Sequence, residues 1–220
     1  DRLYTYFLVN LEEHDIRFFW KDPEGGVLGD LGSLRSLVDT CYESELVFAT
    51  NGGMYLPDQS PQGLYIENGK LWKPADTLKG EYGNFYLQPN GIFLITDSRR
   101  ADLITTDSFL NLSTQDLGRI RYATQSGPMV LHRGEINPVF VKGSRNLNIR
   151  SGVGWLDPGR IVFLISDDRV NFHDFASVFK ERFGCTEALY LDGAISRIYL
   201  PALRRYDMGG QFGVMIGVLK

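Results

Sequence analysis

The stretch IVFLISDDRVNFHDFASVFKERFGCTEALYLD (residues 161–192) has the pattern of a strand, a helix and a second strand. Its first five residues are all apolar, as is typical of a buried central strand. Apolar side chains then recur at helical spacing from Phe172 to Phe183, and Gly184 follows as a helix terminator. Residues 188–191 are again apolar, so we expect a strand–helix–strand unit with one parallel crossover.

Short apolar runs separated by Gly, Asn and Pro dominate the rest of the chain. Residues 4–9 are expected to pair with residues 16–20, and residues 31–41 to form a helix with Asp30 as its N-cap. Asn-Gly pairs at 68–69 and 90–91 predict two hairpins. Further strands are expected at residues 46–49, 64–67, 84–88, 92–96, 129–132, 195–200 and 212–219.

This pattern indicates an α+β fold, with one mixed, largely antiparallel sheet flanked by helices. The chain has 220 residues, of which 43% are hydrophobic, and this suffices for a single domain with one core. The net charge is −4 and no run of Lys or Arg occurs, so a nucleic-acid partner is not expected. No apolar run approaches the ~18 residues of a transmembrane segment. Cys41 and Cys185 are expected to be buried free thiols, with a disulfide as the alternative.

Polar residues stand beside glycine where several apolar segments end. Catalytic groups favour such places, and glycine lets the backbone approach a ligand and expose N–H groups to an anion. The helix that begins near Asn171 adds a further polar group. The residues at these positions are Asn51, Gly52, Gly53, Gln125, Ser126, Arg150, Asn171, His173, Asp174, Asp192, Gly193, Ser196 and Arg197.

Seven segments in a fixed order carry a resemblance to a known family. They are FATNGGMY (48–55), SPQGLYIENGK (60–70), GNFYLQPNGIF (83–93), ATQSGPMVL (123–131), RSGVGW (150–155), VNFHDFA (170–176) and ALYLDGAISRIY (188–199). The ordered set resembles the phosphodiester glycosidase family, in particular its bacterial branch. The resemblance departs from the family at Ala194, usually glycine, at Arg197, usually a small residue, and at Ser151, more often Asn or Thr.

The resemblance implies a hydrolase that cleaves a glycosyl phosphodiester at the anomeric C–O bond and releases free sugar, such as N-acetylglucosamine, and a phosphomonoester. Residues 1–220 would be a single domain, with N-terminal strands and a helix in 1–45 and the catalytic core in 46–220. The bacterial branch is often exported and the chain begins at Asp1. A periplasmic or secreted location is therefore expected, with the leader absent from this chain.

The chemistry passes through an oxocarbenium-like state and needs a cation for the phosphate and a carboxylate for the sugar. Arg150 is the expected phosphate clamp, because a guanidinium forms two parallel bonds to phosphate oxygens, and Arg197 would add to it. Asp192 is the expected carboxylate, and His173 a general acid or base. Asn51, Asn171 and Ser196 would bind sugar hydroxyls or orient water, and the N–H groups of Gly52, Gly53 and Gly193 would complete the anion site. Gln125, Ser126 and Asp174 are further expected substrate contacts.

Three alternatives remain open. A metal-dependent phosphodiesterase would use Asp167, Asp168, His173, Asp174 and Asp192 as hard ligands, although no recognised ligand spacing is present and no cofactor is indicated. A serine hydrolase would use Ser126 with His132 or His173, without the glycine that normally precedes such a serine. The third is a non-catalytic glycan-binding module.

Overall fold

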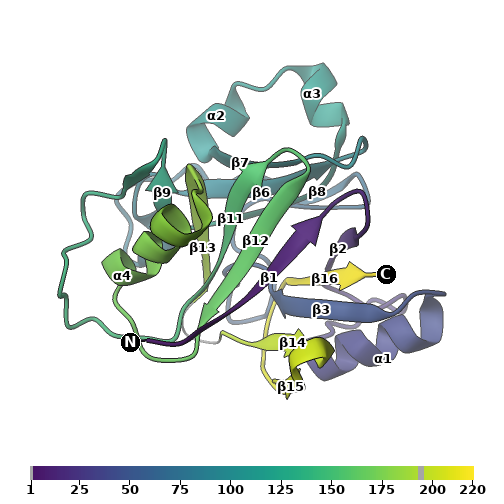
Figure 1. Ribbon diagram of the computed structural model, residues 1–220. Coiled ribbons are helices and arrows are strands. Elements are labelled where there is room, and N and C mark those ends of the chain that lie inside the picture. The colour runs from purple at the N-terminus through teal and green to yellow at the C-terminus, as the bar shows by residue number, and fades with distance from the viewer. Residues whose placement is uncertain (1, 193–195) are drawn as a thin grey trace.

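Three antiparallel sheets surround one central core in the computed structural model, which describes residues 2–192 and 196–220 (Figure 1). The first sheet has the order β1–β12–β11–β13–β9–β10. These strands span Tyr4–Asn10, Arg160–Ser166, Ser151–Asp157, Glu187–Asp192, Met129–His132 and Glu135–Ile136. All ladders between the described strands of this sheet are antiparallel.

The second sheet has the order β15–β14–β3–β16–β2, and the third has the order β5–β4–β8–β6–β7. The second contains Arg205–Tyr206, Ile198–Leu200, Leu46–Asn51, Met215–Leu219 and Asp15–Phe19. The third contains Lys70–Lys73, Tyr65–Glu67, Ile120–Ser126, Gly91–Thr96 and Ala101–Thr105. The α+β class is thereby confirmed.

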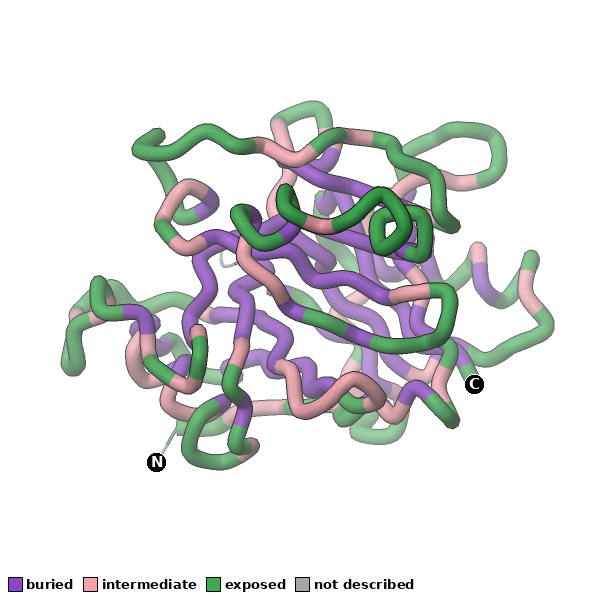
Figure 2. The backbone as a smooth tube through the Cα atoms, turned by 90° about the horizontal axis from the view of Figure 1, so that it is seen from above, coloured by how far each residue is buried: buried purple, intermediate pink, exposed green. Residues whose placement is uncertain are grey.

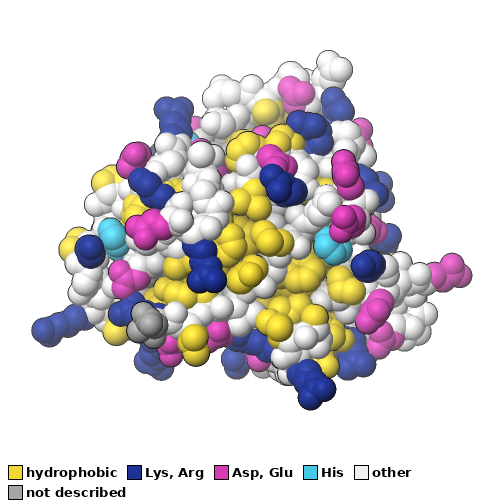
Figure 3. Space-filling view, in the orientation of Figure 1, with side chains coloured by type: hydrophobic (Ala, Val, Ile, Leu, Met, Phe, Trp, Pro, Cys, Tyr) yellow, Lys and Arg dark blue, Asp and Glu magenta, His cyan; other side chains and the backbone are white. Residues whose placement is uncertain are grey.

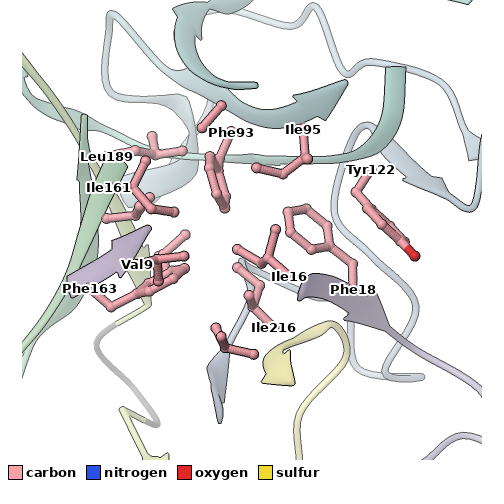
Figure 4. Packing of buried hydrophobic residues seen from close by; sticks show 14 of the residues in the cluster. Val9, Ile16, Phe18, Phe93, Ile95, Tyr122, Ile161, Phe163, Leu189 and Ile216 are labelled. Carbon is pink, nitrogen blue, oxygen red and sulfur yellow. The ribbon is translucent and has the colours of Figure 1, made fainter. Parts of the chain in front are cut away.

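Aromatic side chains join the three sheets at the centre (Figure 4). The Phe93 ring of β6 lies 5.4 Å from Phe18 of β2 and 6.0 Å from Phe163 of β12, between ring centroids. Phe163 also stacks on Phe48 of β3 at 5.0 Å. Each of these rings is at most 2% exposed. Burial of an aromatic side chain contributes roughly 2–3 kcal/mol, so this cluster holds the sheets against one another.

Helices cover the outer faces of the sheets (Figure 1). The helix α1 (Leu31–Cys41) begins at Asp30, whose Oδ1 accepts from Ser33 N at 2.7 Å as the sequence predicted, and packs on the second sheet. The short helices α2 (Thr106–Leu110) and α3 (Thr114–Gly118) lie beyond the third sheet.

The helix α4 (Phe172–Ser177) continues as a π-helical turn over Val178–Arg182 and covers the first sheet. Seen from above, buried strands fill the centre and exposed loops the rim (Figure 2). On the face of Figure 3, hydrophobic side chains gather over β1, β11 and β12 and charged side chains surround them. Within residues 2–192 and 196–220, the structure contains no helix of a length and apolarity that would cross a membrane.

Several expected pairings are corrected by the structure. Residues 4–9 pair with β12 and residues 16–19 pair with β16, so the two N-terminal strands belong to different sheets. The segment Asn84–Tyr86 is a short 3-10 helix and not the first arm of a hairpin, because β6 pairs instead with β7 and β8. The strands β12 and β13 do run parallel, but β11 lies between them and pairs antiparallel with both.

Candidate functional site

Four strand ends meet at the hydroxyl of Ser151. Because β11 begins where its antiparallel partner β13 ends, Ser151 stands opposite Asp192. Ser151 Oγ accepts from Asn51 Nδ2 at 2.9 Å and from Ser196 Oγ at 3.3 Å, and lies 3.1 Å from the main-chain oxygen of Asp192. Ser196 Oγ donates to the same oxygen at 2.8 Å. Asn51, Ser151 and Ser196 therefore fix the backbone at Asp192.

The side-chain amide of Asn51 is hydrogen-bonded within this network through both its oxygen and its nitrogen. Its side chain is fully buried, and its Oδ1 also accepts from Thr50 Oγ1 at 3.2 Å and from Arg197 N at 3.3 Å. Thr50 Oγ1 in turn lies 2.9 Å from the carbonyl oxygen of Arg197. Asn51 thus joins the end of β3 to the start of β14, as a positioning residue rather than an exposed binding group.

Arg150 is buried, with only 1% of its surface exposed. Its Nε donates to Val170 O at 2.9 Å, its Nη2 to Asn146 O at 3.0 Å and its Nη1 to Tyr190 Oη at 3.4 Å. The Cζ atom of the guanidinium lies over the Phe172 ring, 3.5 Å from its centroid. Burial lowers the pKa of Arg150 from its ordinary value, because the low-dielectric surroundings disfavour the charged form.

None of the salt bridges between side chains of residues 2–192 and 196–220 includes Arg150. A buried cation whose neighbours are carbonyls, a phenol and an aromatic ring is costly, since none of them carries a full negative charge. Of the charged side chains that the structure describes, only Arg150 and Asp192 are buried, and Asp192 is 7% exposed. The two buried charges are of opposite sign.

Tyr190 lies close to both buried charges. Burial raises the pKa of Tyr190, the charge of Arg150 lowers it and the charge of Asp192 raises it further. Burial and the charge of Asp192 also raise the pKa of Tyr55, a half-buried residue beyond β3. Neither phenol was predictable from the sequence, because a tyrosine within or near an apolar run gives no signal that its hydroxyl faces a charge.

The start of α4 holds three of the expected residues. Asn171 is its N-cap, with Oδ1 accepting from Asp174 N at 2.8 Å and Nδ2 donating to Asp174 Oδ2 at 3.0 Å. Asp174 also pairs with Arg2. His173 Nδ1 lies 3.8 Å from Asp174 Oδ1 and is buried without a hydrogen-bond partner among the described atoms.

His173 borders a cavity of about 220 Å³. Phe172 and Phe140 stack at 4.6 Å in its wall, and Asn84 and Asn146 contribute amide groups to the lining. The guanidinium of Arg150 lies over Phe172 and donates to the carbonyl of Asn146, so Arg150 contacts two of the residues that line this cavity without lining it itself. Aromatic faces next to amides and an imidazole can bind a small polar ring.

Gln125 and Ser126 hold the scaffold together. Gln125 Oε1 accepts from Leu64 N and Asp76 N, both at 2.9 Å, and its Nε2 donates to Asp76 O at 2.8 Å and Thr106 Oγ1 at 3.1 Å. The amide of Gln125 is therefore fully used away from Asp192. Ser126 Oγ donates to the carbonyl oxygen of Leu191 at 3.0 Å, which ties β8 to β13.

The expected glycine N–H groups are only partly available. The N–H of Gly52 donates to Val214 O at 2.8 Å, which continues the hydrogen bonding of β3 to the chain before β16, so the expected role in anion binding is wrong for this group. Gly53 has φ +148°, and a Cβ there would lie 2.8 Å from Thr124 Oγ1. The expected contact of Gly193 and the departure at Ala194 lie outside the described residues.

The ligands expected for a metal-dependent enzyme are dispersed. Asp167 pairs with Arg205, Asp168 accepts from the backbone N of Leu3 at 2.9 Å, and Asp174 caps α4. No set of three or more His, Cys, Asp or Glu side chains placed to hold a metal ion occurs in the part of the chain that the structure describes.

The described hydrogen bonds give no support to the serine-hydrolase alternative. The Ser126 hydroxyl is directed to Leu191 O, while His132 Nδ1 lies 2.8 Å from Glu187 Oε2.

Both cysteines are free, and Cys185 is buried while Cys41 is exposed. The disulfide alternative does not hold, and the expected burial is correct for Cys185 only.

Comparison with known proteins defines the class of this fold and site. Residues 44–210 match the phosphodiester glycosidase family, and the chain belongs to that family. It is 34% identical over 194 residues to the uncharacterized protein YigE of Escherichia coli (strain K12), an alignment that covers 88% of this chain and 73% of YigE.

Solved structures share the fold. The catalytic domain of zebrafish N-acetylglucosamine-1-phosphodiester alpha-N-acetylglucosaminidase, auto-inhibited by its pro-peptide, superposes with a TM-score of 0.60 at 14% identity, over 98% of this chain and 87% of the other. A hypothetical protein from Synechocystis superposes with a TM-score of 0.58 at 12% identity, over 98% of this chain and 59% of that protein. A candidate exported protein from Burkholderia pseudomallei K96243 superposes with a TM-score of 0.61 at 12% identity, over 99% of this chain and 74% of that protein.

Proposed function

We propose that the chain hydrolyses a glycosyl phosphodiester at the anomeric C–O bond, releasing free sugar and a phosphomonoester. The observation that carries the proposal is the pair of buried opposite charges, Arg150 and Asp192, both of which shift the pKa of Tyr190. Membership in the phosphodiester glycosidase family supports the substrate class. N-acetylglucosamine is the sugar we propose, by analogy with the name of the zebrafish enzyme.

Arg150 would bind the phosphate. A phosphate oxygen supplies the full negative charge that the carbonyls, Tyr190 and Phe172 do not. The guanidinium has five N–H groups, and three described bonds leave others for a ligand. Its fixed position means that little side-chain entropy is lost on binding.

Asp192 would act on the sugar side. As the C–O bond breaks, its electron pair passes to the phosphate oxygen, and the carboxylate of Asp192 stabilises the positive charge that develops on the sugar ring. Water then supplies the hydroxyl of the free sugar and releases one proton. Because a phosphomonoester is a good leaving group, no strong acid is needed on that side. Ser151 and Ser196 hold the main chain of Asp192 in place.

The cavity at His173 would hold the sugar ring. His173 Nδ1 needs a hydrogen-bond partner, and Phe140 offers apolar surface in the lining, while the faces of Phe172 are covered by Phe140 and Arg150. Asn171 and Asp174 would position His173 from the cap of α4. We also propose an exported location, on the ground that one structural neighbour is a candidate exported protein.

The test is hydrolysis of methyl and nucleotide esters of N-acetylglucosamine-1-phosphate, with Asp192→Asn and Arg150→Met beside the parent chain. We expect free sugar plus phosphomonoester, and a loss of kcat of at least about 100-fold in each variant. Asp97→Asn is the control, since Asp97 is exposed and pairs only with Arg119. Sugar-1-phosphate as product would replace this proposal with P–O cleavage.

A non-catalytic glycan-binding module is the second candidate, favoured by the aromatic cavity of Phe140 and Phe172. Binding of N-acetylglucosamine-1-phosphate esters that Asp192→Asn leaves intact, with no turnover by the parent chain, would support that reading. Turnover by the parent chain would exclude it.

A further inference from the structure

A second, larger hollow lies beside the site just described. We name it the arginine cleft, because Arg169, Arg197 and Arg205 all line it, and its volume is about 680 Å³. It lies beside the end of β12 and the beginning of β14, and β15 contributes Arg205. This volume falls in the range of sites that bind small organic ligands.

The charges of the arginine cleft are only partly balanced. Arg205 pairs with Asp167 and with Asp207, and these two carboxylates also line the cleft. The side chains of Arg169 and Arg197 are exposed and make neither a hydrogen bond nor an ion pair with another described side chain. Three guanidinium groups and two carboxylates leave the cleft with one excess positive charge, which favours an anionic occupant.

The arginine cleft adjoins the proposed site through two serines. Ser166 lines the cleft, and its Oγ accepts from the backbone N of Arg150 at 2.9 Å. Ser196 also lines the cleft and donates to the main-chain oxygen of Asp192. The two serines therefore connect the cleft with the backbone of Arg150 and Asp192, and a substrate held by these two residues could extend into the cleft.

We infer that the arginine cleft binds a second phosphate of the substrate, beyond the phosphate whose ester bond is broken. The inference rests on the proposed function. A phosphate group accepts two parallel bonds from a guanidinium, and Arg169 and Arg197 offer two such forks in one hollow. The second phosphate would come either from a sugar nucleotide with a pyrophosphate or from the next unit of a phosphodiester-linked glycan.

Binding of inorganic pyrophosphate tests the arginine cleft without requiring catalysis. We expect Arg169→Gln to weaken pyrophosphate binding about tenfold in calorimetry at about 0.15 M salt, since a charge-assisted contact is lost. Arg121→Gln makes the same change in charge at an exposed position of β8 and should leave the affinity unchanged. Equal affinities in the parent, Arg169→Gln and Arg121→Gln chains would overturn the inference, and so would equal losses in both variants.

Kinetics then identify the source of the second phosphate. Three substrates are compared, namely methyl N-acetylglucosamine-1-phosphate, UDP-N-acetylglucosamine and a synthetic dimer of N-acetylglucosamine-1-phosphate units. Arg169→Gln should raise KM about tenfold for the nucleotide sugar or for the dimer and leave the methyl ester unaffected. A KM shift that is the same for all three, or absent from all three, would overturn the inference. If pyrophosphate binding depends on Arg169 but no ester is cleaved, the proposed hydrolase function is wrong, whereas the anion site in the arginine cleft stands.

Discussion

Replacing Ser151 by alanine removes one hydroxyl at the point where β3, β11, β13 and β14 meet. The Nδ2 atom of Asn51 then loses its acceptor, Ser151 Oγ at 2.9 Å, and the Asn51 side chain is fully buried, so water cannot replace it. A buried donor without a partner costs about 1–3 kcal/mol. The carbonyl of Asp192 keeps its 2.8 Å bond from Ser196, so it adds little to the loss. We expect the free energy of unfolding to fall by about 2 kcal/mol.

A double-mutant cycle with Asn51 isolates the bond. Asn51→Ala alone should cost about 3 kcal/mol, because it also leaves Arg197 N without its side-chain acceptor, whereas Thr50 Oγ1 keeps its 2.9 Å bond to Arg197 O. The double variant should be about 1–2 kcal/mol less destabilised than the sum of the single changes, since the Asn51–Ser151 bond is then lost only once.

The assay is urea unfolding followed by tyrosine and tryptophan fluorescence, with the slope against urea required to stay constant. Ser36→Ala, on the exposed side of α1, is the matched control and should change stability by no more than about 0.5 kcal/mol. A loss below about 0.5 kcal/mol for Ser151→Ala, or strict additivity with Asn51→Ala, would refute the reasoning.

The other predictions concern binding, packing and titration. Phosphate at 100-fold its Kd for the Arg150 site should stabilise the parent chain by about 2.7 kcal/mol in thermal unfolding. Arg150→Met should remove this gain and leave only the smaller gain from phosphate bound in the arginine cleft; an equal gain in both chains would contradict the anion role of Arg150. Gly154→Ala should cost about 1–3 kcal/mol in urea unfolding, because the new Cβ would lie 2.5 Å from Phe179 Cδ1, whereas Gly118→Ala meets nothing and should be neutral or stabilising. Burial raises the pKa of the Cys185 thiol to about 12, so Ellman's reagent at pH 8 should label Cys41 alone until the chain is unfolded. Because the folded-state pKa lies above the unfolded value, that thiol's contribution to stability is complete below pH 9 and declines as the pH rises towards 12.

Local features of the fold were predictable from the sequence. The Asp30 cap and apolar spacing located α1, and the Asn68-Gly69 turn located the β4–β5 hairpin, since capping and turn chemistry act over a few residues. Sheet membership was not predictable in the same way. The N-terminal strands at 4–9 and 16–20 look like a hairpin, yet each pairs with a strand more than 140 residues away.

The candidate site divides in the same manner. Asn51 and Asp192 end β3 and β13, Arg150 directly precedes β11 and Ser196 lies two residues before β14, so these polar residues stand at the edges of strands as the sequence predicted, while their part in catalysis stays a prediction. Arg150 and Asp192 are buried charges, whereas Asn51 and Ser196 hold the backbone in place. Which residue has which of these two roles depends on the direction of its side chain, and sequence spacing alone does not give that direction. Tyr190 bonds Arg150 through its hydroxyl, but in the sequence its ring reads as one more apolar residue of β13.

The most direct measurement is hydrolysis of methyl N-acetylglucosamine-1-phosphate in ¹⁸O-labelled water, with both products analysed by mass. If Arg150 binds the phosphate and Asp192 acts on the sugar, the bond that breaks is C–O, and the label should appear in the free sugar with none in methyl phosphate. Label in a phosphate product, or sugar-1-phosphate among the products, would contradict the account.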